Sequence, residues 1–207
     1  MKQTSPAKVT DLHILYLHGF LSSPQSKKAQ QTLRYCQSLG IADRLLIPSM
    51  LDGPAETIEQ LEDLIDGIPL HQLGVIGSSL GGYYATWIAE EFGVPAVLIN
   101  PAVRPFELWE DHLGEHKNYY SDHIHVVTRD HIAELKSLDR HPLKYPEQFM
   151  VMLQTGDEVL DYRDAEEKFQ DSRLLIHENG DHSYQQYDAE LPVVIEFLLS
   201  RIDRSAR

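Results

Sequence analysis

Short apolar runs alternate with amphipathic stretches along most of the chain. The runs at 13–17, 44–48, 73–77, 95–99, 149–153 and 174–176 consist mainly of apolar residues, which is typical of strands buried on both faces of a parallel sheet. The stretches at 24–39, 54–65, 80–92, 162–169 and 191–199 carry apolar residues at helical spacing. The alternation predicts an α/β fold with about six parallel strands and helices on both faces.

Local signals mark the ends of the predicted helices. Ser23 is expected to cap the first helix, with Pro24 at its first position, and Gly40 is expected to end it. Pro54 opens the second helix and Gly93 ends the third. These signals give the alternation of strands and helices defined boundaries.

Residues 101–147 interrupt the alternation. The segment lies between the fourth and fifth predicted strands, is longer than a simple crossover, and carries Pro, His, Tyr and charged residues with short helical stretches. A parallel-sheet enzyme can hold a lid over its site at such a position without disturbing the core. We therefore expect one domain over 1–207 with a short helical, lid-like insertion at about 101–147.

Composition and charge restrict the class of protein. Of the 207 residues, 42% are hydrophobic and only Cys36 is a cysteine, so an intramolecular disulfide is excluded and a reducing compartment is expected. A net charge of −14 argues against a nucleic-acid partner, because binding that polyanion requires clustered Lys and Arg. The polar N-terminus and the short first apolar run argue against a signal peptide or membrane insertion, so a cytoplasmic location is expected. The oligomeric state is left open.

The segment Gly77-Ser78-Ser79-Leu80-Gly81 joins the third predicted strand to the third predicted helix. A G-x-S-x-G sequence in this context is typical of a nucleophile elbow, a sharp strand-to-helix turn that exposes the serine side chain. Larger residues at 77 or 81 would clash within such a turn. We therefore predict that Ser79 is a nucleophile.

A serine nucleophile requires an acid that orients its base, and in an open parallel sheet such groups follow the carboxyl ends of strands. Three carboxylates follow the strand 149–153. Asp157 is nearest to the strand end and is the predicted acid. Asp161 lies where the next helix begins and is expected to cap it, and Glu158 is expected to be solvated.

The predicted base is His182, which lies in the loop after the last strand and can reach back to Ser79. His177 is at the end of that strand and is expected to be packed or at the surface. Asp181 adjoins His182 and so cannot easily orient its ring. The order Ser79, Asp157, His182 is the one expected of the α/β-hydrolase arrangement.

Two backbone N–H groups are predicted to form an oxyanion hole. Leu80 follows the nucleophile at the start of a helix, whose N-terminal end carries partial positive charge. After the first strand the chain reads His18-Gly19-Phe20, and Gly19 lets the backbone turn so that the Phe20 N–H points inward. His18 is expected to support this loop by hydrogen bonding. Phe20 and Leu80 are therefore the predicted oxyanion donors.

Four segments carry a resemblance to a known family: Tyr16-Leu17-His18-Gly19-Phe20, the block 77–86, Asn100-Pro101-Ala102 and the block 155–162. They are similar to those of the YqiA esterase family of small bacterial α/β-hydrolases, and the similarity spans nearly the whole chain. The resemblance implies esterase activity on acyl esters, with acyl-CoA thioesters as a further substrate class. It also implies a reduced α/β-hydrolase fold that lacks strands before the first one here.

Two residues of the segment 101–147 are candidates for substrate binding. Arg104 is suited to an anionic part of a substrate, with a salt bridge to Glu107 or Glu110 on its own short helix as the alternative. Trp109 either lines an acyl pocket or packs the insertion. The sequence leaves both alternatives open for each of these two residues.

No metal site and no cofactor are predicted. His112 and His116 are four residues apart, and His123 and His125 are close in sequence. Without a cysteine cluster or an H-E-x-x-H pattern, these histidines are expected to be surface residues.

Together the residues predict a serine hydrolase that cleaves carboxylic acyl esters through an acyl-enzyme on Ser79. The expected partner is a small-molecule acyl ester or thioester. An acyl-CoA thioesterase is the alternative within the same chemistry. A non-catalytic hydrolase-fold protein that binds a ligand or a partner is the alternative of another class, and the combination of Ser79, Asp157 and His182 at strand ends argues against it.

Overall fold

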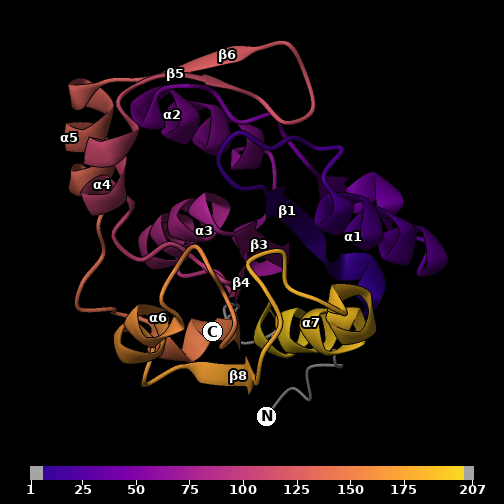
Figure 1. Cartoon of the computed structure of the whole chain (residues 1–207). Coiled ribbons are helices and arrows are strands. Elements are labelled where there is room, and N and C mark those ends of the chain that lie inside the picture. The colour runs from indigo at the N-terminus through magenta and orange to yellow at the C-terminus, as the bar shows by residue number, and fades with distance from the viewer. Residues whose placement is uncertain (1–6, 203–207) are drawn as a thin grey trace.

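The computed structural model describes residues 7–202, so most of the polar N-terminal stretch lies outside the described residues (Figure 1). The main sheet has six strands in the spatial order β2-β1-β3-β4-β7-β8, and every neighbouring pair is parallel. The predicted parallel sheet is confirmed. Its strands are β1 (His13–Leu17), β2 (Leu45–Leu46), β3 (Leu73–Ser78), β4 (Ala96–Ile99), β7 (Phe149–Gln154) and β8 (Arg173–His177).

Helices cover both faces of this sheet, as the sequence predicts. One face packs against α1 (Lys27–Ser38) and α7 (Tyr187–Ile202). The other face packs against α2 (Pro54–Ile65), α3 (Leu80–Phe92) and α6 (Tyr162–Lys168). None of the helices within residues 7–202 combines the length and the apolar character needed to cross a bilayer. Short 3-10 helices lie at Val9–Asp11, Ala42–Arg44, Leu70–Gln72, Trp109–His112 and Pro146–Gln148.

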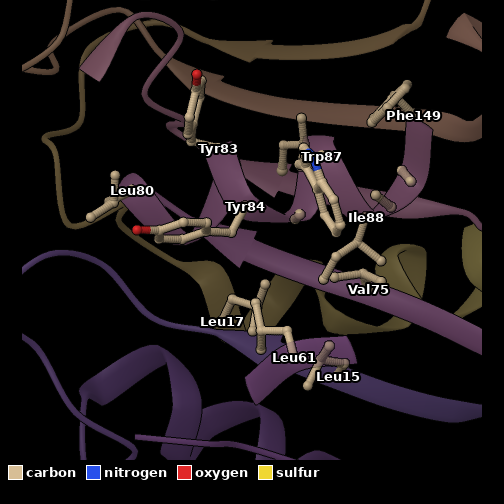
Figure 2. Packing of buried hydrophobic residues seen from close by; sticks show 14 of the residues in the cluster. Leu15, Leu17, Leu61, Val75, Leu80, Tyr83, Tyr84, Trp87, Ile88 and Phe149 are labelled. Atoms are coloured by element: carbon tan, nitrogen blue, oxygen red, sulfur yellow. The ribbon is translucent and has the colours of Figure 1, made fainter. Parts of the chain in front are cut away.

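Burial on both faces explains why the strands are almost continuously apolar. Along β1, Ile14 and Tyr16 face the α1–α7 side, whereas Leu15 and Leu17 face the α3 side. Figure 2 shows the α3 side, where Trp87 and other side chains of α3 pack over the strands. Each fully buried Leu or Ile contributes about 1.5–3 kcal/mol relative to its exposed state, so this two-sided packing holds the carboxyl ends of the strands in register.

The first helix begins later than the sequence predicts. α1 begins at Lys27 with Ser26 as its N-cap, so the predicted cap at Ser23 and the predicted first position at Pro24 are wrong. The Ser23 hydroxyl instead accepts a hydrogen bond from the N–H of Gln25, two residues on, which satisfies it within a local turn. Gly40 follows Leu39, the C-cap residue of α1, and has a φ of +72°, the left-handed conformation that favours glycine after a helix.

The segment 101–147 contains a β-hairpin that the sequence pattern did not reveal. Its helices are α4 (Pro105–Leu108) and α5 (Arg129–Ser137), and between them lie the antiparallel strands β5 (Gly114–Lys117) and β6 (Ile124–Val127). In Figure 1 the hairpin lies beside α2. Polar Glu, His and Lys side chains occupy four of the eight strand positions, so the apolar alternation of the two strands is too weak to predict them.

Candidate active site

Ser79 lies in a strained turn between β3 and α3. Its φ of +56° and ψ of −122° are unusual for a residue with a side chain. A Cβ atom added at Gly77 would collide with the carbonyl oxygen of Gly81, and one added at Gly81 would collide with the carbonyl oxygen of Leu17. The steric requirement predicted for positions 77 and 81 is therefore confirmed.

The structure brings Ser79, His182 and Asp157 into one line of contacts. Ser79 Oγ lies 3.0 Å from His182 Nε2, and Asp157 Oδ2 lies 2.8 Å from His182 Nδ1. The Asp157 side chain is only 2% exposed, and its Oδ1 accepts the N–H groups of Val159 and Leu160 at 2.9 Å. Because a carboxylate can only accept, His182 Nδ1 must donate to it, which leaves Nε2 free to accept the Ser79 hydroxyl proton. The catalytic roles of these residues stay predictions.

The other carboxylates and the other histidine considered as acid or base do not join this line of contacts. Asp161 Oδ1 accepts the N–H of Arg163 and caps α6, as predicted. His177 Nε2 lies 3.2 Å from a carboxylate oxygen of Glu190, outside the line of contacts. Glu158 is exposed, as expected, but it also accepts the backbone N–H of His182 at 3.0 Å, a contact that the sequence did not indicate.

The segments that carry the two predicted oxyanion donors lie next to Ser79, and the role of the donors stays a prediction. Leu80 is the first residue of α3, so its N–H has no intrahelical partner. The loop that carries Phe20 is pressed against the elbow, because a Cβ atom on Gly19 would lie 3.1 Å from the Ser79 Cβ. His18 is buried, its Nδ1 lies 3.0 Å from the Gly19 carbonyl oxygen, and burial lowers its pKa. A neutral imidazole therefore supports this loop.

A small cavity of about 40 Å³ is lined by Phe20, Leu80 and Trp109 together with other residues. Trp109 is 4% exposed, and its ring centroid lies 5.0 Å from that of Phe20. It therefore both packs the insertion and lines a cavity beside the predicted oxyanion donors. The two interpretations of Trp109 are compatible.

Arg104 does not line this cavity. It lies at a second one, of about 80 Å³, with Leu108 and Val159. Its guanidinium lies 3.1 Å from a carboxylate oxygen of Glu107 and 3.4 Å from one of Asp164. The salt bridge considered as an alternative is therefore formed, and a role in substrate binding stays a prediction.

The hairpin is tied to the loop before α2 through histidines. Asp52 Oδ1 lies 2.8 Å from His123 Nε2 and 3.1 Å from His125 Nδ1. His125 is 9% exposed and packs edge-on against Phe20 at 4.9 Å, so the expectation of a surface residue is wrong for it. Burial lowers the pKa of His125, and the nearby Asp52 partly opposes this. Within the described part of the chain, no group of three or more His, Cys, Asp or Glu side chains is arranged to hold a metal ion.

Sequence reasoning missed three side chains that hold the histidine loop. Asn100 and Gln154 are 2% and 5% exposed, and both amides bond to the loop around His182. The Lys28 ammonium donates to the Ser183 carbonyl at 2.8 Å, and burial lowers its pKa to about 8. For Asn100 and Gln154 the sequence offers one indication of such a role, because each is a polar residue at the end of an apolar strand.

Solved structures show the fold to which this arrangement belongs. Est1E from Butyrivibrio proteoclasticus, solved with ferulic acid bound, matches with a TM-score of 0.71 and 12% identity over 95% of this chain and 91% of that chain. A putative hydrolase from Agrobacterium vitis matches with a TM-score of 0.68 and 18% identity, with the same coverage. The chain has the α/β-hydrolase fold, as predicted.

Relatives in sequence show the family. A protein of Shewanella sp. (strain ANA-3) is 28% identical over 196 residues, which cover 90% of this chain and 99% of that protein. One of Shewanella oneidensis is 26% identical over 195 residues, with the same coverage. Both are described as UPF0227 proteins, and the pattern of that family matches residues 13–199. The chain therefore belongs to the uncharacterised protein family UPF0227, the YqiA family that its motifs resemble.

Proposed function

We propose that the protein is a serine hydrolase that cleaves carboxylic acyl esters through an acyl-enzyme on Ser79. The observation that carries the proposal is the distance of 3.0 Å between Ser79 Oγ and His182 Nε2, with Asp157 on the other ring nitrogen. In such an arrangement the imidazole takes the serine proton, so the hydroxyl can attack at neutral pH. Esterases among the solved structures of the same fold support an ester substrate.

Acylation follows from the positions of these groups. Ser79 Oγ attacks the acyl carbon while its proton passes to His182 Nε2. The imidazolium that forms keeps its Nδ1–H donated to Asp157, and the buried carboxylate stabilises its charge. The tetrahedral intermediate then collapses, the bond to the leaving alcohol breaks, and the alcohol departs with the proton from Nε2.

Deacylation uses the same groups with water as the nucleophile. His182 takes a proton from the water, whose oxygen attacks the acyl carbon, and then returns the proton to Ser79 Oγ as the acid is released. In both steps the N–H groups of Phe20 and Leu80 would donate to the oxyanion. Losing one such donor costs about 100- to 1,000-fold in rate, and no step requires a cofactor.

The segment 101–147 acts in this proposal as a lid-like insertion within one domain. It contributes Trp109 to the cavity beside the oxyanion donors, so the acyl group of the substrate would lie against that ring. Arg104 lies at a separate cavity, and it would contact the leaving group rather than the acyl group.

A fluorophosphonate probe tests the proposal. The native protein should be labelled covalently, and Ser79→Ala should abolish the labelling. Ser78→Ala is the matched control, because Ser78 is the adjacent serine but is buried, and it should stay labelled. If the native protein is not labelled, the proposal is wrong and a ligand- or partner-binding role is favoured.

A second assay separates esters from thioesters. An oxygen ester and a thioester with the same acyl group and similarly sized leaving groups should both be hydrolysed, with the larger kcat/KM for the oxygen ester. The reverse order would make the protein a thioesterase that uses the same nucleophile.

A further inference from the structure

The end of β4 lies between the segments that carry the predicted nucleophile and acid. In the sheet, β4 has β3 on one side and β7 on the other. The N–H of Ser79 donates to the Ile99 carbonyl at 3.1 Å, and the Ser79 carbonyl accepts the N–H of Ala102 at 3.0 Å. Residues 99–102 therefore hold the backbone of the elbow on both sides of Ser79.

Asn100, at the centre of this segment, extends the connection to the other two segments. Its Oδ1 accepts the N–H of Gln154, the last residue of β7, at 3.0 Å. Its Nδ2 donates to the carbonyl oxygens of Asp181 at 3.0 Å and His182 at 3.3 Å. The side chain is buried, and its backbone is in the left-handed region at φ +40°, where Asn is one of the few residues accepted. One amide thus joins the strands of the nucleophile and the acid to the loop of the base.

Gln154 holds the same loop from the acid strand. Its Oε1 accepts the N–H groups of Asp181 at 3.1 Å and Gln185 at 2.8 Å, and its Nε2 donates to the Gln185 carbonyl at 3.0 Å. A Cβ atom on Gly180 would collide with the Gln154 side chain, so the loop passes directly over this amide. The loop is therefore bonded to two buried side chains on either side of His182.

The loop requires such support, because residues 178–186 connect β8 to α7 without regular secondary structure. Three of its non-glycine residues, Asn179, Tyr184 and Gln186, have positive φ values, a conformation that costs free energy and persists only when its surroundings hold it. The two amides satisfy the N–H groups of Asp181 and Gln185 and three of the loop's carbonyl groups, and being neutral they add no charge of their own beside the His182–Asp157 pair.

We propose that Asn100 and Gln154 are positioning residues that hold the His182 ring between Ser79 and Asp157. This inference rests on the proposed function, because it assigns a role in the same site. Neither amide would contact substrate, and both act through the backbone of the loop. A displacement of the reacting groups by about 1 Å can cost about 100-fold in rate, so small movements of this loop should reduce kcat strongly.

The test is a comparison of steady-state kinetics between the native protein and Asn100→Gly. Glycine accepts the positive φ, so the variant removes the amide without adding backbone strain. We expect kcat to fall about 100-fold and KM to change less than about 3-fold, because Phe20, Leu80 and Trp109 lie on other segments. Gln154→Met, which keeps the side-chain length but loses the three hydrogen bonds, should have the same effect and provides a second, independent variant.

Glu90→Gln is the matched control for loss of stability. Glu90 is also buried and also holds a loop, through the N–H groups of Lys144 and Tyr145, but it lies near the opposite end of α3 from Ser79. The control should lower the unfolding temperature and leave kcat per folded molecule unchanged.

Two outcomes are distinguishable. If the native protein does not react with a fluorophosphonate, the proposed function fails. If the native protein reacts, but Asn100→Gly and Gln154→Met keep the native kcat per folded molecule, the positioning role alone is refuted.

Discussion

Replacing Asp157 with Asn should stop catalysis by changing the proton position on His182. Asp157 Oδ1 accepts two backbone N–H groups, from Val159 and Leu160, so the amide oxygen of an Asn must occupy that place. The amide nitrogen then takes the Oδ2 position, 2.8 Å from His182 Nδ1. Two donors would face each other unless the ring moves its proton to Nε2, and in that tautomer Nε2 cannot accept a proton from Ser79.

The expected magnitude is large. The same substitution in a serine-protease triad lowers kcat about 10,000-fold through the wrong tautomer, which corresponds to about 5.4 kcal/mol of transition-state stabilisation. Folding should be little affected, because the Asn side chain has the same shape and keeps the two backbone hydrogen bonds.

The assay compares kcat for an activated ester in Asp157→Asn and in the matched variant Asp161→Asn. Both remove one negative charge from the same loop, but Asp161 caps α6, and Asn is an equally good cap. We expect Asp161→Asn to keep kcat within a few-fold of the native value. If Asp157→Asn retains native activity, or if Asp161→Asn is the variant that loses it, the assignment of the acid is refuted.

Three further predictions follow from packing and burial. Gly81→Ala should destabilise the protein by about 3 kcal/mol or more, because the added Cβ would collide with backbone oxygens that cannot move aside. Urea unfolding measures this change, and a variant that unfolds at the same urea concentration as the native protein would contradict it. Trp109→Ala should lower the free energy of unfolding by about 3–5 kcal/mol and enlarge the cavity beside Phe20. Among nitrophenyl esters of graded acyl length, the ester with the highest kcat/KM should then have a longer chain. An unchanged dependence of kcat/KM on chain length would exclude this cavity as the acyl site. Burial raises the pKa of the Cys36 thiol to about 11, so Ellman's reagent at about pH 8 should react with this cysteine only after unfolding, and rapid reaction of the native protein would show an exposed thiol.

The sequence predicts the sheet, the elbow and the order of the candidate triad because each depends on local signals. Gly77 and Gly81 indicate the tight turn around Ser79, and apolar runs mark the strands whose ends carry the other groups. The order Ser79, Asp157, His182 then follows from chain position alone.

Features that depend on distant contacts could not be predicted. Asn100 bonds to residues about 80 positions away, and nothing next to it in sequence identifies those partners. His125 alternates with exposed residues in β6 and resembles a surface histidine, but Phe20 and Asp52 bury it from other segments. At Ser23 two local structures compete, and the turn that ends at Gln25 prevails over the helix cap.

The most direct test of the central claim is to identify the acylated residue. Hydrolysis of an activated ester is stopped with acid within the first turnovers, and the protein is digested and analysed by mass spectrometry. We predict one acyl group on the peptide that carries Ser79, none in Ser79→Ala, and a release rate that accounts for steady-state turnover. Ester hydrolysis at the native rate by Ser79→Ala, or an acyl group on a different residue, would contradict the account.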